Sequence, residues 1–69
     1  MEYRTVLDAD GRRDERYIDA QSSEEAARMT IRAWRYDTHC RDILKREGYE
    51  HFVFSSGRLI GSVDVYERP

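Results

Sequence analysis

The chain has few of the residues that crosslink a fold or interrupt it. It holds one cysteine, one proline and four glycines among 69 residues. A single cysteine excludes an internal disulfide and a zinc site built from four thiolates, and it fits a reducing setting. No apolar run reaches the roughly 18 residues of a membrane span, and no apolar segment near the start resembles a signal peptide. These absences predict a cytoplasmic protein that contacts no membrane.

The chain also lacks a marked excess of charge of either sign. Twelve basic residues face fourteen acidic ones, for a net charge of −2. That balance has neither the basic excess of a typical nucleic-acid binder nor the acidity of a DNA mimic. Eleven of the twelve cations are arginines, with Lys45 as the exception. Their planar guanidinium groups suit phosphate or carboxylate partners.

Large apolar side chains are present in sufficient number for one modest core. Hydrophobic residues make up 39% of the chain, and the aromatics include five tyrosines. This composition excludes a disordered chain, and the length fits a single domain spanning residues 1–69.

The stretch 22–47 carries the pattern of one long amphipathic helix. Ser22 and Glu25 have the spacing of a capping box, and Gly48 has the position of a C-terminal cap. Residues at intervals of three and four place one apolar stripe on the helix: Ala26, Met29, Ala33, Tyr36, Cys40 and Ile43. Such a helix is longer than a short strand, so it overhangs the sheet, bends, or breaks near Asp37 and Thr38.

Four other stretches alternate in the manner of strands, namely 2–7, 15–20, 49–55 and 58–67. Asp10-Gly11 has the composition of a hairpin turn, residues 12–14 extend the loop, and Gly61 suggests a bulge. For the first strand the pattern does not decide which side faces inward.

This order predicts an α+β fold, a four-stranded antiparallel sheet (β-β-α-β-β) with the helix packed on one face. The sheet residues expected in the core are Ile18, Ala20, Phe52, Phe54, Leu59, Val63 and Val65. The opposite face is then left open, and it carries Tyr17, Tyr49, His51, Val53, Ile60 and Tyr66.

Two surfaces are candidates for binding a partner. The outer helix side carries Arg28, Arg32 and Arg35, which can contact carboxylates or phosphates, or form a solvated face neutralised by neighbouring acids. The open sheet face carries Tyr17, Tyr49, His51 and Tyr66. Aromatic rings on a sheet can stack on nucleic-acid bases, but Asp19 and Asp64 on the same face would repel a phosphate backbone. These residues suit a protein interface or self-association better or, as surface residues, pack only on neighbouring strands.

Catalytic and metal chemistry find little support in the sequence. His39 and Cys40 are adjacent on a helix and point about 100° apart, so they do not converge on a metal or on each other. The chain has no phosphate-binding glycine loop. We therefore expect no enzyme activity, no metal site and no cofactor.

One stretch carries a resemblance to known proteins. Ile18-Asp19-Ala20-Gln21-Ser22-Ser23-Glu24-Glu25-Ala26-Ala27-Arg28-Met29 resembles a strand-to-helix passage of small phage and mobile-element proteins. Among these are anti-CRISPR proteins, which fold as one helix against an antiparallel sheet. The resemblance implies a stoichiometric inhibitor that docks on a host nuclease or surveillance complex and blocks its access to nucleic acid.

The sequence thus predicts a non-catalytic interaction protein, an anti-CRISPR-like inhibitor that binds a host protein complex. One alternative is a direct nucleic-acid binder that uses the helix arginines. Another is a small regulatory homodimer that associates through the open sheet face.

Overall fold

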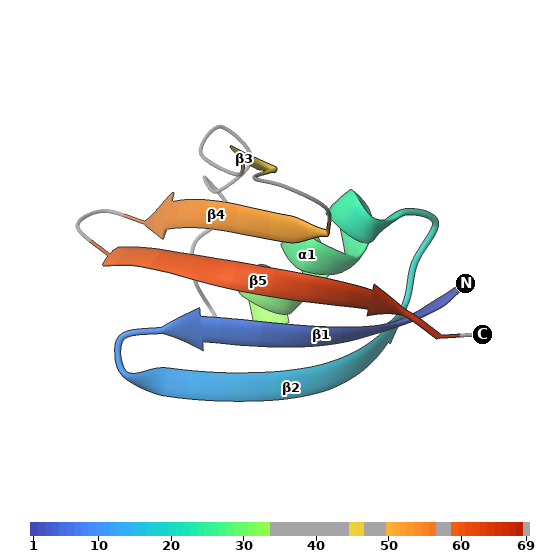
Figure 1. The fold of residues 1–69 in the computed structure, drawn as a ribbon, viewed down its shortest axis with the longest axis horizontal. Helices are drawn as coiled ribbons and strands as arrows, with labels where there is room; N and C mark the ends of the chain where they lie inside the picture. Colours follow the sequence, from blue (N-terminus) through green and yellow to red (C-terminus); the bar gives the residue numbers. More distant parts are fainter. Residues whose placement is uncertain (34–44, 47–49, 57–58, 69) are drawn as a thin grey trace.

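The computed structural model describes residues 1–33, 45–46, 50–56 and 59–68. Five antiparallel strands form one sheet in the order β2-β1-β5-β4-β3, and one helix packs on one side of it (Figure 1). The elements are β1 (Glu2–Ala9), β2 (Arg12–Asp19), α1 (Ser23–Ala33), β3 (Lys45–Arg46), β4 (His51–Ser56) and β5 (Leu59–Glu67). The predicted α+β class and the four long strands are confirmed, and the two-residue β3 is an addition.

A tight hairpin joins β1 to β2. Asp10 and Gly11 both have positive φ, 53° and 72°, as a two-residue type I′ turn requires. Because this turn is so short, Ala9 pairs directly with Arg12. Residues 12–14, predicted as loop, therefore belong to β2.

The last long strand lies beside the first. β5 pairs along β1, and the Arg68 amide donates to the Glu2 carbonyl at 2.9 Å. The start of β1 and the end of β5 consequently lie at the same end of the sheet (Figure 1).

The helix begins where the capping pattern predicted. The Glu25 amide donates to the Ser22 hydroxyl at 3.1 Å, as in a capping box. The Glu25 carboxylate accepts from the amide of Gln21 at 3.0 Å, one residue before the predicted donor, Ser22.

The buried face of α1 differs from the predicted stripe. Met29 is 37% exposed and Ala33 is also exposed, so both assignments were wrong. The residues that face the sheet, again at intervals of three and four, are Ser23, Ala26, Ala27, Thr30 and Ile31. Tyr36, Cys40 and Ile43 lie outside the described residues.

Thr30 explains the difference. Its hydroxyl donates to the Ala26 carbonyl at 2.8 Å and lies 2.7 Å from the hydroxyl of Thr5 on β1. These bonds satisfy a polar group that is fully buried. A stripe selected only for apolar residues leaves out Thr30. The predicted helix face is therefore rotated relative to the face that contacts the sheet.

The predicted helix end is also wrong. Lys45 and Arg46 form β3 and pair with Val53 and Phe52 of β4, so the helix does not continue to residue 47. One edge of β4 pairs with β5, and the other edge is free to pair with a short strand. Pairing with β4 gives the backbone N–H and C=O groups of β3 the hydrogen-bond partners that a helix would supply internally. The predicted break near Asp37 lies outside the described residues.

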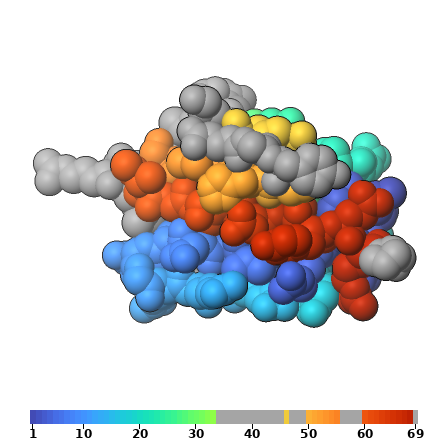
Figure 2. All heavy atoms as spheres, viewed as in Figure 1, coloured from blue at the N-terminus to red at the C-terminus, as the bar shows by residue number. Residues whose placement is uncertain are grey.

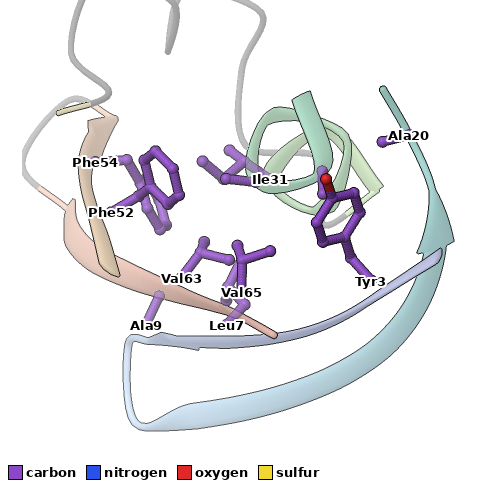
Figure 3. Close-up of a cluster of buried hydrophobic side chains, with 11 residues drawn as sticks. Tyr3, Leu7, Ala9, Ala20, Ile31, Phe52, Phe54, Val63 and Val65 are labelled. Atoms are coloured by element: carbon purple, nitrogen blue, oxygen red, sulfur yellow. The ribbon is translucent and has the colours of Figure 1, made fainter. Parts of the chain in front are cut away.

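The core lies between α1 and the sheet (Figure 3). Ala20, Phe52, Phe54, Val63 and Val65 are buried as predicted, and Ile18 packs against them while partly exposed. The side chain of Leu59 is outside the described set. The first strand contributes the residues whose direction was undecided: Tyr3, Thr5, Leu7 and Ala9.

Gly61 marks a close contact and not the suggested bulge. It pairs in continuous register with Ala9 on one side and Phe54 on the other. A Cβ atom here would lie 2.6 Å from Cζ of Phe54 and 2.8 Å from Cβ of Ala9. The glycine thus leaves room for the Phe54 ring against β5.

We expect Ile31→Ala to lower the free energy of unfolding by about 2–4 kcal/mol, because it opens a cavity in the core. Met29→Ala, two residues earlier on the same helix, should cost less than about 1 kcal/mol. Urea denaturation of both variants checks the helix orientation. Equal losses, or a larger loss for Met29→Ala, would contradict it.

Gly61→Ala should destabilise the fold by about 1–3 kcal/mol, because the added methyl group overlaps the Phe54 ring. Ser62→Ala, at the neighbouring half-buried position on the other face, serves as the control and should be close to neutral. Thermal and urea unfolding measure both, and a neutral Gly61→Ala would disprove the close contact.

Candidate functional site: the open face of the sheet

The sheet face opposite α1 is the surface seen in Figure 2. Residues paired directly across antiparallel strands point to the same side. The register therefore sets Tyr17 of β2, Arg4 of β1 and Tyr66 of β5 in one row across this face. A second row on the same face lies two residues further along each strand. It consists of Glu15, Val6, Asp64 and His51.

Guanidinium groups cover the aromatic rings of the first row. The Arg4 guanidinium carbon lies 4.5 Å from the Tyr66 ring centroid, and that of Arg68 lies 4.8 Å from the Tyr17 centroid. These distances are typical of cation–π contacts. Tyr17 is 59% and Tyr66 is 47% exposed. We name this set, Tyr66, Arg4, Tyr17 and Arg68, the Arg–Tyr row.

Carboxylates hold the two arginines of the row in place. Arg4 lies 3.5 Å from Glu15, and Arg68 lies 2.7 Å from Glu2. Exposed ion pairs of this kind add little to stability. Their effect is to restrict the arginine rotamers, so that the row presents a defined pattern of rings and N–H donors.

The second row is polar around one apolar residue. Nδ1 of His51 lies 2.5 Å from the Asp64 carboxylate across β4 and β5. Val6 is buried between the charged side chains on this face, although it points away from α1. The open face therefore carries charges of both signs over a small apolar centre.

The structure brings together three of the four open-face residues predicted to bind a partner. Tyr17 and Tyr66 lie in one row with Arg4 between them, and His51 lies on the same face in the neighbouring row. Tyr49 is outside the described residues. Sequence reasoning missed Arg4 and Arg68. The alternation of Arg4 with the buried Tyr3 and Thr5 was the available signal, but it needed the direction of β1.

Of the arginines predicted on the outer helix side, Arg28 is largely covered. Its side chain is only 23% exposed and lies 3.4 Å from Glu24, one helical turn away. Arg32 is exposed, and Arg35 lies outside the described residues. Arg46, which falls within the predicted helix 22–47, belongs to β3, where it donates to Ser23 and lies over the Phe52 ring.

Two open hollows are lined by residues that the structure describes. One, of about 480 Å³, is lined by Met1, Asp19, Ala20, Gln21 and Glu25. The other, of about 320 Å³, is lined by Glu50, Val65, Tyr66 and Glu67. Within the described ranges, no three His, Cys, Asp or Glu side chains gather as a metal ion would require. Among the residues that the structure describes, no helix is long and apolar enough to cross a membrane.

Tyr3 of β1 pairs with Glu67, one of the residues that line the second hollow. Burial raises the pKa of its hydroxyl above the ordinary value of 10.0, and the negative charges of Glu67 and Glu50 raise this pKa further. The folded state therefore favours the protonated form of Tyr3.

This shift gives a pH dependence. Stability contributed by protonated Tyr3 is fully present below the ordinary pKa and is lost as pH rises through the higher folded-state pKa. Unfolding midpoints measured from about pH 8 to about pH 11 should therefore fall more steeply for the wild type than for Tyr3→Phe. The other tyrosines are common to both proteins, so parallel profiles would rule out this contribution.

Comparison of the chain with models of protein families, with curated proteins and with solved structures finds no match.

Proposed function

We propose that this chain is a non-catalytic interaction protein that binds a protein partner through the open face of its sheet. The observation that carries the proposal is the Arg–Tyr row, with its two exposed rings beside two oriented guanidinium groups. Tyrosine and arginine are among the residues that most often dominate binding energy at protein interfaces. Because their rotamers are already restricted, binding orders few side chains.

The charges around the row favour a protein over a nucleic acid. Glu2 and Glu15 contact the two arginines, and Asp64 and Asp19 lie on the same face. A phosphate backbone laid across the rings would meet these carboxylates. A protein surface of mixed charge can instead place donors and acceptors opposite both signs.

The finer form of the proposal is an inhibitor. The passage from Ile18 to Met29 resembles that of small phage and mobile-element proteins of the anti-CRISPR type, and the fold class agrees with that resemblance. On this proposal the chain is a stoichiometric inhibitor that occupies a host nuclease or surveillance complex and blocks its access to nucleic acid.

The test begins with capture of partners from the native host and continues with calorimetry on the purified partner. Tyr17→Ala, Tyr66→Ala and Arg4→Ala should each weaken binding about 30-fold, equivalent to about 2 kcal/mol. Arg32→Ala, an exposed arginine on the helix side, is the matched control and should bind like the wild type. Circular dichroism confirms that the surface variants fold.

Two results would contradict the proposal. One is a loss of binding confined to Arg32→Ala, which assigns the contact to the helix. The other is binding to single- or double-stranded nucleic acid that falls steeply with salt and is abolished by Arg4→Ala, which assigns the face to phosphate recognition.

A further inference from the structure

The outer edge of β2 is a second candidate surface for association, apart from the open face of the sheet. β2 ends the sheet order β2-β1-β5-β4-β3, and in the part of the chain that the structure describes no strand pairs with its outer side (Figure 1). It is eight residues long and exposed over most of its length. Such an edge presents a row of backbone donors and acceptors to any strand that approaches.

One hydrogen bond fixes which groups point outward. The Ala20 amide donates to the Met1 carbonyl at 2.9 Å, so even-numbered residues at this end of the hairpin bond toward β1. The tight turn that pairs Ala9 with Arg12 gives the same alternation at the other end. The N–H and C=O groups that point to the free edge are therefore those of Arg13, Glu15, Tyr17 and Asp19.

Symmetry restricts how two copies of β2 can pair. A two-fold axis that makes two edge strands antiparallel lies perpendicular to the sheet, so each face of one copy continues into the same face of the other. Directly opposed residues must then share a face. An odd-numbered residue can therefore oppose only an odd-numbered residue, and an even-numbered residue only an even-numbered one. Every allowed register is then centred on one residue, which lies opposite its own copy.

The charges of β2 favour the register centred on Glu15. In this register Asp14 lies opposite Arg16 of the second copy, and Arg13 lies opposite Tyr17, each pair occurring twice. Asp14 and Arg16 already form an ion pair within each chain at 2.6 Å, so the four charges of the two copies would alternate in sign across the seam. The one unfavourable pair is Glu15 with its own copy. Each Glu15 already has Arg4 of its own chain at 3.5 Å, which compensates the repulsion.

The next register, centred on Arg16, is less favourable. It pairs Arg13 with Asp19 twice but sets the two Arg16 residues opposite each other. Even-numbered residues bond toward β1, so this central pair would be non-hydrogen-bonded, the kind in which side chains lie closer together.

We propose that two copies of this chain associate by antiparallel pairing of their β2 strands, centred on Glu15, to form one continuous sheet. The association is weak, because a strand edge buries little surface. The same pairing carries the open face of one copy into that of the other. This inference does not depend on the proposed function.

Sedimentation equilibrium over about a hundredfold range of concentration, extending to the millimolar range, tests the pairing. The wild type should shift from 8.2 kDa toward twice that mass as concentration rises. Asp14→Arg and Arg16→Asp should each weaken association about 10-fold, because each sets like charges opposite each other twice. The double variant Asp14→Arg, Arg16→Asp should restore it, and Glu15→Gln should strengthen it.

A charge reversal on the helix, Glu24→Arg, is the control and should leave association unchanged. Glu15→Pro is a second test, because it removes an N–H that faces the partner and none that faces β1. Thermal unfolding confirms that the variants fold. A protein that stays monomeric throughout the range would overturn the proposal. So would a dimer that is indifferent to the charges of β2, or one lost only in Tyr66→Ala.

Discussion

The placement of β1 between β2 and β5 is the constraint on which the rest of the structure depends. Its backbone bonds on both edges, so its side chains divide strictly between two faces. On one face Thr5 bonds Thr30, and Tyr3 and Leu7 pack in the core beside α1. On the other, Arg4 separates two tyrosine rings. The position of the helix and the content of the candidate site both follow from one strand.

Much of the fold could be predicted from the sequence, because local chemistry specifies it. Asp10-Gly11 fits the positive φ of a hairpin turn, Ser22 and Glu25 form the helix start, and alternation in β4 and β5 places Phe52, Phe54, Val63 and Val65. The rotation of α1 could not be predicted this way. Thr30 is polar in the sequence and becomes a core residue only because Ala26 and Thr5 satisfy its hydroxyl.

The candidate site was harder to predict, because it is built from contacts between strands that are distant in sequence. Tyr17 and Tyr66 could be assigned to one face from alternation within their own strands. Arg4 joins them only when the order β2-β1-β5 is known, since that order sets it between them. Arg68 follows the last strand, where no periodicity exists to indicate its direction.

The division of β1 between two faces has a consequence for how its length can vary. Losing or gaining one residue within the strand would reverse the direction of every side chain on one side of the change. Either Arg4 would then face the helix while Tyr3 faces solvent, or Leu7 would face solvent while Val6 faces the helix, so packing and surface chemistry would be damaged together. A change of two residues preserves the phase of both faces, and the hairpin tip at Asp10-Gly11 is the place where it disturbs least. The core-facing and solvent-facing positions of β1 can therefore be shifted only together, in steps of two residues.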